Sequence, residues 1–387
     1  MKKFIRFSLF LLAAGLVAAV SCKKSSDDEP EATIFADPAN CFMVNSPGFY
    51  TFKANKGKTH EAVGAIASVE VLWESFGTTE QPSKGNIISQ AYYKDGQVFF
   101  KTPATLKDGN AVIAAQDAAH NILWSWHIWV CAGWDATATA QKYFNKSNGT
   151  ITYGAVMDRN LGATSTSIDD VKSFGLLYQW GRKDPFLGND GVTEHTPAVS
   201  TLKWPDPVRT DAEKGTIEYA IAHPTTILYP GNVSSNVDWY YTDVQNTTDN
   251  TRWNEKKDLY DPCPAGWTLP RAFVKKDEGL WFDALVNWPV YIPDWDKTRH
   301  GYDFAGTLGN AASIWYPFNG FYSYIDGKLY DGGNTTNIWS SDVPADQQNV
   351  DAFVFHVRIS LQEDLMVEAA SYASRANAFP TRCVAVK

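Results

Sequence analysis

Apolar and polar positions alternate with a period of two in several short stretches of the first third of the chain. In ASVEVLWESF (67–76), Val69, Val71 and Trp73 fall on one face of an extended chain and two glutamates on the other, which is typical of a half-buried strand. The stretch QVFFKTP (97–103) predicts another strand, before the turn residues KDGN (107–110). Short strands of this kind, without a helical period, favour a β-sandwich.

A β-hairpin is predicted for residues 111–130, with the turn residues DAAHN (117–121) between its strands. One face of its second strand carries a continuous set of apolar side chains: Ile122, Trp124, Trp126, Ile128 and Val130. His127 falls on the opposite face, among Leu123, Ser125 and Trp129. A single histidine on a strand usually belongs to the packing, so we expect a structural role for His127.

The rest of the chain mixes short strands, one helical pattern and long loops. Strands are predicted within TYGAVMDRNLGAT (152–164), TNIWSSD (336–342) and NAFPTRCVAVK (377–387). Apolar residues recur at helical spacing in AFVKKDEGLWFDALVNW (272–288), which predicts a helix. The expected fold class is therefore mainly β with some α, divided into a β-sandwich at 37–136 and an α+β domain at 137–387.

The first 36 residues predict secretion and anchoring. A basic start and an apolar stretch make 1–21 a signal peptide. The residues AAVSC that end it resemble a bacterial lipobox, which predicts lipidation of Cys22; an ordinary secretion signal is the alternative. Residues 22–36 would then be a flexible tether, and their acidic cluster at 27–29 looks like a surface-export signal of Bacteroidota lipoproteins. We expect a lipid-anchored protein of the outer membrane that faces the cell exterior, with the membrane as a partner.

Composition narrows the possible partners. The chain has 34 Lys+Arg against 43 Asp+Glu, a net charge of −9. An acidic chain without a basic stripe repels phosphate backbones, so no nucleic-acid partner is expected. The content of 15 Trp, 18 Tyr and 21 Phe is high. Aromatic side chains are therefore candidates for a surface that contacts a ligand.

Four cysteines remain if Cys22 is lipidated, and an even number in an oxidising compartment indicates disulfides. The domain division separates Cys41 and Cys131 from the other two, so we expect a bridge between Cys263 and Cys383. Pairing of Cys41 with Cys131 stays open. Three prolines in YDPCPAGWTLPR (260–271) make the backbone around Cys263 rigid and irregular, which suits a staple better than a reactive thiol.

Five motifs in order carry a resemblance to a known family: MDRNLGA (157–163), LLYQWGRKDPF (176–186), DPCPAGWTLPR (261–271), IWSSD (338–342) and FPTRCV (379–384). They resemble the Fibrobacter succinogenes major paralogous domain family, over residues 137–387. The resemblance implies a C-type-lectin-like fold shared with formylglycine-generating enzymes, in a Bacteroidota surface lipoprotein. Residues 37–136 resemble the immunoglobulin-like module that often precedes this domain.

No enzyme motif is complete. The chain has no G-x-S-x-G, and His60–Glu61 does not continue as H-E-x-x-H. Formylglycine-generating enzymes use two closely spaced C-terminal cysteines, whereas only Cys383 lies there. A glycosidase needs a pair of carboxylates, and nothing singles one out. The calcium motif of lectins is also incomplete at RWNEK (252–256). We therefore expect no catalysis, no metal and no cofactor.

Three loop-like stretches place aromatic residues beside Asp and Asn: VDWYYTD (237–243), NWPVYIPDWDK (287–297) and IWYPFNGFYSY (314–324). Such side chains can form contact surfaces for sugars or proteins. The candidate ligand-binding residues are Trp239, Tyr240, Tyr241, Asp294, Trp295, Trp315 and Tyr316. The alternative is that these aromatics fill the core. The charged residues 158–159 and 182–184 are interpreted as a buried network that holds loops.

The sequence thus predicts a non-catalytic cell-surface lipoprotein, an adhesin-like or minor pilus-tip component that binds glycan or protein through aromatic-rich loops. The second hypothesis is an accessory glycan-binding lipoprotein of a polysaccharide-uptake system. A glycan-active enzyme is the third.

Overall fold

The computed structural model describes residues 31–144, 148–191, 204–232, 237–243, 248–254, 256–273, 279–281, 290–293, 295–304, 313–344, 351–360 and 362–386. The described chain is mainly β, with several sheets and very little helix. Met1–Glu31 and Ala32–Lys387 are two separate units. The predicted signal peptide, Cys22 and most of the predicted tether lie outside the described residues.

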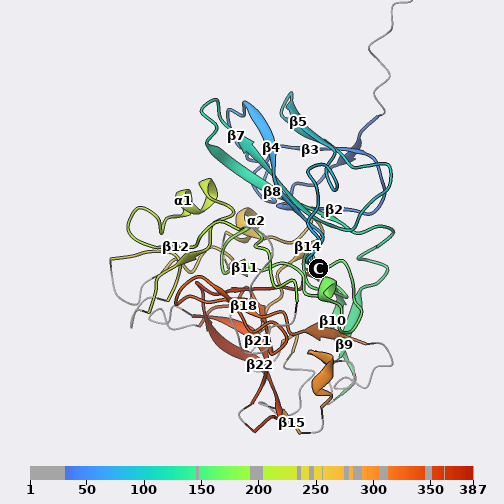
Figure 1. Ribbon diagram of the computed structural model, residues 1–387, viewed down its shortest axis with the longest axis vertical. Coiled ribbons are helices and arrows are strands. Elements are labelled where there is room, and N and C mark those ends of the chain that lie inside the picture. Colours follow the sequence, from blue (N-terminus) through green and yellow to red (C-terminus); the bar gives the residue numbers. More distant parts are fainter. Residues whose placement is uncertain are drawn as a thin grey trace, which may run out of the picture. The chain divides into compact units, whose positions relative to one another are not determined.

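Two four-stranded sheets form the region that ends near Val130 (Figure 1). One has the order β1 (Thr33–Phe35), β3 (Phe49–Lys53), β6 (Gln97–Lys101) and β5 (Gln90–Lys94). The other has the order β2 (Cys41–Val44), β8 (Ile122–Val130), β7 (Gly109–Gln116) and β4 (Ser68–Ser75). Phe52 joins the two sheets, because its ring lies 4.1 Å from Phe42 and 5.2 Å from Trp126. The strands predicted from alternation and the predicted hairpin are confirmed.

The predicted tether is shorter than expected, because its last residues form strand β1. Thr33, Ile34 and Phe35 pair in parallel with β3. The ring of Phe35 packs 5.0 Å from Phe42 and 5.6 Å from Tyr50. Burial of the Phe35 ring therefore contributes to holding this segment against the sheet.

Strand β8 is buried on both faces, although alternation predicts one covered face. Trp124 and Trp126 face the first sheet's side of the core, but His127 and Trp129 are equally buried. The indole of Trp129 donates to Ala163 O at 3.2 Å, so residues of the later region cover this second face. His127 has a structural partner, Asn110 Oδ1 at 2.9 Å, and burial lowers the pKa of its imidazole to about 3.

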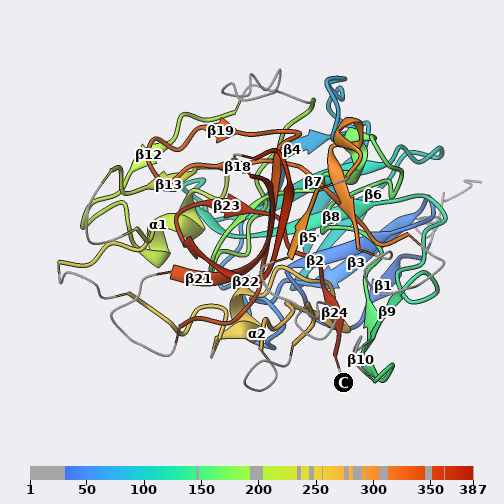
Figure 2. The same cartoon turned by 90° about the horizontal axis from the view of Figure 1, so that it is seen from below.

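Three further four-stranded sheets follow (Figure 2). The first has the order β14 (Trp267–Thr268), β24 (Val384–Ala385), β10 (Ile151–Val156) and β9 (Gln141–Phe144). The second has the order β11 (Tyr178–Gln179), β23 (Ala378–Phe379), β18 (Phe321–Tyr322) and β19 (Leu329–Tyr330). The third has the order β15 (Val290–Ile292), β22 (Leu365–Ser374), β21 (Asp351–Ile359) and β20 (Thr335–Trp339). The strands predicted within 152–164, 336–342 and 377–387 are confirmed.

Short elements complete the described chain. Two-stranded sheets pair β12 (Val208–Arg209) with β13 (Leu228–Tyr229) and β16 (Gly301–Asp303) with β17 (Trp315–Pro317). The helices are α1 (Ile217–Ala222) and α2 (Lys257–Tyr260), with 3₁₀ turns η1 (Val171–Ser173) and η2 (Lys297–Arg299). Most of the helix predicted for 272–288 falls outside the described residues, and the described parts, 272–273 and 279–281, are not helical.

The disulfide between Cys263 and Cys383 is confirmed. Their Cα atoms are 6.0 Å apart, and the bond lies beside the pairing of β14 with β24. Asp261 fixes the proline-rich segment, because its Oδ1 accepts from Cys263 N at 2.8 Å. The bond therefore ties the last strand to the rigid segment at 260–271.

The second bridge, which the sequence leaves open, is not formed: Cys41 and Cys131 are buried free thiols. Cys41 is paired with His127 in the parallel ladder of β2 and β8, so Cys131 lies four positions further along. At about 3.3 Å a residue, that separation exceeds the roughly 7 Å limit for a disulfide.

The two regions assigned to separate domains at 37–136 and 137–387 share contacts. One cluster of buried residues contains Phe52 and Trp126 from the first region and Trp253 and Cys263 from the second. The carboxamide of Asn40 donates to two backbone carbonyls, at residues 259 and 261, at 2.9 and 3.0 Å. The boundary between 136 and 137 stays a prediction. Buried side chains of the two regions pack against each other across it.

Candidate functional site

The charged residues 182–184 form a buried network, as interpreted from the sequence, whereas Asp158 is only half-buried. Lys183 pairs with Asp184 at 2.6 Å, and both contact the hydroxyl of Ser125 on β8. Arg182 donates to Gln179 Oε1 at 3.0 Å and Thr226 O at 2.7 Å. These charges hold loops and the two regions together, so they are not available to a ligand.

The aromatic stretch 237–243 contributes mostly to the core. Trp239 is 1% exposed, and its indole donates to Trp180 O at 2.8 Å. The guanidinium of Arg252 lies 4.6 Å from the ring centroid of Trp239. Tyr240 is half-buried, whereas Tyr241 is 38% exposed. A hydrogen bond with Asp243 raises the pKa of the Tyr241 hydroxyl.

The other candidate residues divide between core and surface. Tyr316 is fully buried and its hydroxyl lies 2.6 Å from that of Tyr143. Trp295 is half-buried and donates to Glu363 O at 3.0 Å, while Asp294 lies outside the described residues. Trp239 and Tyr316 belong to different clusters of buried residues. The structure thus does not combine the predicted aromatic residues into one surface.

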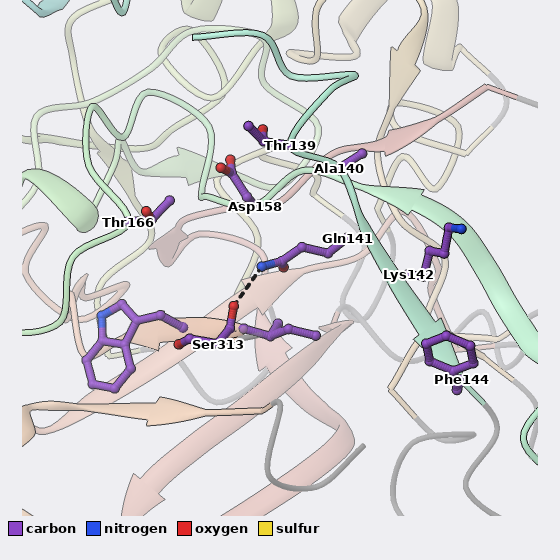
Figure 3. A pocket seen from close by; sticks show the side chains of 10 residues that line it. Thr139, Ala140, Gln141, Lys142, Phe144, Asp158, Thr166 and Ser313 are labelled. Atoms are coloured by element: carbon purple, nitrogen blue, oxygen red, sulfur yellow. Dashed lines mark hydrogen bonds between the residues drawn. The ribbon is translucent and has the colours of Figure 1, made fainter. Parts of the chain in front are cut away.

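Trp315 is the candidate residue that borders a cavity, which we call the Trp315 pocket (Figure 3). The pocket has a volume of about 500 Å³, within the size range of small-molecule sites. It is lined from β9 and the turn before it, from the loop after β10 and from the start of β17: Thr139, Ala140, Gln141, Lys142, Phe144, Asp158, Thr166, Ser313, Ile314 and Trp315.

Two buried polar atoms of the pocket residues have no hydrogen-bond partner within the described chain. They are the indole nitrogen Nε1 of Trp315 and the carbonyl oxygen Oε1 of Gln141. The same Gln141 donates through Nε2 to Ser313 O at 2.9 Å (Figure 3), so its orientation is fixed. Buried polar groups are nearly always paired in folded proteins. The unpaired donor and the unpaired acceptor on this pocket are therefore groups to which a polar ligand could bind.

Asp158 supplies the carboxylate of the pocket and is held by its neighbour. Arg159 donates to both carboxylate oxygens, through Nε at 2.9 Å and through Nη2 at 3.1 Å. Arg159 in turn stacks 4.3 Å from Trp134 and donates to Cys131 Sγ at 3.2 Å. Burial raises the pKa of the Cys131 thiol to about 11, so this sulfur is a neutral acceptor.

Trp315 is positioned by the turn before β16. The ring is 4% exposed, and the guanidinium of Arg299 lies 5.6 Å from its centroid. Gly301 packs directly against the indole, where any side chain would collide with the ring. The bond from Ile314 N to Asp303 Oδ1, at 3.0 Å, fixes the strand on the other side. The indole is thus held rigidly with its N–H unpaired.

The pocket suits binding of hydroxyl groups. A hydroxyl both donates and accepts, so ligand hydroxyls could satisfy both Trp315 Nε1 and Gln141 Oε1. Asp158 is the single carboxylate among the described lining residues. Within the described ranges, no group of three or more His, Cys, Asp or Glu is arranged to hold a metal ion.

Comparison with known proteins adds no family. No protein-family model, curated protein or solved structure matches the chain. Among the helices that the structure describes, none is long and apolar enough to cross a membrane.

Trp315 was among the candidates predicted from the sequence, whereas Gln141 and Ser313, which line the same pocket, were not. These two residues are far apart in sequence and are brought together by the position of β9 beside the start of β17. A glutamine on a short strand carries no sequence signal of its own, so only the three-dimensional structure identifies it.

Proposed function

We propose that the chain is a non-catalytic, lipid-anchored protein of the bacterial outer surface, an adhesin-like or minor pilus-tip component that binds a glycan or a protein. In this proposal an immunoglobulin-like module precedes a C-type-lectin-like module of the Fibrobacter major paralogous kind. The N-terminal motif at Cys22 supports the anchor, and the five ordered motifs support the second module.

The observation that carries the binding proposal is the unpaired donor and acceptor of the Trp315 pocket. Leaving a buried polar group without a partner costs about 1–3 kcal/mol. A ligand that pairs both groups gains that free energy on binding. Sugars suit this demand, because their hydroxyls are donors and acceptors at once. The pocket therefore favours the glycan version of the proposal over the protein version.

The arrangement of charges supports binding rather than hydrolysis. Asp158 is tied to Arg159 by two hydrogen bonds, so each of its carboxylate oxygens already accepts one hydrogen bond from the fold. Glycoside hydrolysis needs a second carboxyl group about 5–10 Å away, and no other carboxylate lines the described part of the pocket. The proposed role of Asp158 is to accept hydrogen bonds from ligand hydroxyls.

Replacing Trp315 with phenylalanine is expected to weaken glycan binding about tenfold, because the variant keeps a packed ring but loses the indole N–H. The full-length protein in detergent is first screened on immobilised saccharides. The dissociation constants of parent and variant are then measured by calorimetry with the saccharide that binds best.

The matched control is Trp204→Phe. Trp204 Nε1 is also buried and unpaired, but Trp204 does not line the Trp315 pocket. This control is expected to bind as the parent does. Equal affinities for Trp315→Phe and Trp204→Phe would contradict the assignment of the pocket.

Replacing Cys22 with alanine is expected to move the protein out of the membrane fraction, because the thiol that would carry the lipid is lost. The measurement is fractionation of a diderm bacterial host combined with radiolabelled palmitate. Ser25→Ala, three residues further along, is the control and should remain labelled. An unlabelled parent protein would rule out the lipid anchor.

A further inference from the structure

A second cavity lies over the sheet of β20, β21 and β22, and we call it the sheet groove. Its volume is about 620 Å³. Its floor is the face of these strands that points away from the apolar cluster of Ile338, Phe355 and Val367. Its wall comes from the neighbouring sheet, where β23 contacts β20. The stretch 314–324, predicted from the sequence as a contact surface, contributes Phe321 and Tyr324 to this groove, but the strands of its floor were not predicted as part of a site.

The floor carries one polar row that crosses three strands. Asn337 on β20 is paired with His356 on β21, which is paired with Glu368 on β22. His356 Nδ1 lies 3.1 Å from Glu368 Oε2, and this hydrogen bond lowers the pKa of the Glu368 carboxyl. Directly paired side chains on one face lie about 5 Å apart. The row therefore presents three fixed polar groups to the groove.

Other polar groups of the groove are not used by the fold. The carboxamide of Asn337 makes no hydrogen bond to the described residues, and Asn334 Nδ2 is a buried donor without a partner there. Arg358, one row from His356, is exposed and forms no ion pair within the described chain. Its guanidinium donates a hydrogen bond from Nη2 to Met366 Sδ at 3.8 Å.

The wall of the groove is aromatic. Phe321 and Tyr324 line it from β18 and the turn that follows, and both are half-buried. The backbone of Tyr324 is fixed by the bond from its N–H to Asn377 Oδ1, at 2.8 Å. One side of the groove thus offers ring faces and the other offers hydrogen-bonding groups.

This division fits a sugar. A pyranose ring has apolar C–H faces that pack on aromatic rings and hydroxyls at its rim that pair with amides and charged groups. The charged groups of the groove are of both signs, namely Arg358 with Glu368 and Asp331, and the imidazole of His356 lies beside them. Since no charge of one sign dominates, the groove favours a neutral ligand.

We propose that the sheet groove binds a neutral oligosaccharide, with Asn337, Arg358 and Asn334 donating to its hydroxyls and with Phe321 and Tyr324 against its rings. The inference rests on the proposed binding function and adds a second site to the Trp315 pocket. An extended peptide fits less well. Peptides that add to a sheet pair with the backbone of an edge strand, whereas the groove lies over the side chains of a sheet face.

The test uses the full-length protein in detergent and an array of neutral oligosaccharides built from glucose, mannose, galactose or xylose, together with carboxylated oligosaccharides of the same lengths. The groove variant carries Asn337→Ala and Arg358→Ala. The control is Lys94→Ala, which removes an exposed cation from β5, away from the groove. Thermal unfolding of each variant confirms that it is folded.

A neutral oligosaccharide should bind the parent and Lys94→Ala alike, and should bind the groove variant at least about tenfold more weakly. Unchanged binding by the groove variant would show that the sheet groove is not the binding site, and the proposal for the Trp315 pocket would be unaffected. Binding of carboxylated saccharides alone would contradict the inference that the ligand of the sheet groove is neutral. If no saccharide binds the parent, the groove inference falls, and the proposed function survives only with a protein ligand.

Discussion

Replacing Asp238 with alanine is expected to lower the free energy of unfolding by about 3–5 kcal/mol, the usual cost of removing one partner from a buried ion pair. Asp238 is fully buried and pairs with Arg252 and Arg375. Both guanidiniums are buried against Trp180, and burial lowers the pKa of Arg375 to about 10. Without the carboxylate, two cations would remain in the core beside Trp180.

Urea denaturation of the parent and the variant measures this difference. Asp206→Ala is the control, because Asp206 is exposed and forms no ion pair among the described residues; its effect should stay within about 0.5 kcal/mol. A loss below about 1 kcal/mol for Asp238→Ala would show that Asp238 does not compensate the two arginines.

Replacing Cys263 with serine is expected to cost about 2–5 kcal/mol of unfolding free energy, because the bond to Cys383 closes a long loop. The two residues are 120 positions apart in sequence. The terminal strand β24, which pairs with both β14 and β10, would lose its covalent tie.

The double variant Cys263→Ser with Cys383→Ser is the control, and it should lose about as much as either single variant, since all three lack the same bond. Non-reducing peptide mapping of the parent should recover the linked pair. A Cys263 that reacts with iodoacetamide in the native protein would contradict the disulfide and reopen an enzymatic interpretation.

The sequence predicted the strands well where the burial of one face leaves a period of two. It could not show that the second face of β8 is covered, because the residues that cover Trp129 and Ser125 come from the later region. The pairing of Cys263 with Cys383 followed from the division of the chain. The short β1 was missed because three residues are too few for a pattern.

The candidate site was predicted only in part. Trp239 and Tyr316 occur in polar, loop-like stretches, yet both are buried, since a region with so many loops needs large rings to fill its core. Trp315 was among the predicted residues, but alternation does not reveal that Gly301 and Arg299 pack against its ring. The sheet groove depends on the pairing register of β20, β21 and β22, which alternation does not reveal.

NMR can show whether a ligand pairs with the indole N–H of Trp315. The indole resonances of the ¹⁵N-labelled protein are recorded during titration with the saccharide that binds best, and Trp315→Phe identifies the Trp315 signal by its loss. We expect this signal to shift on binding and the indole proton of Trp315 to become protected from exchange with water. A Trp315 indole signal that stays unchanged while the protein is saturated with ligand would show that the ligand does not bind in the Trp315 pocket.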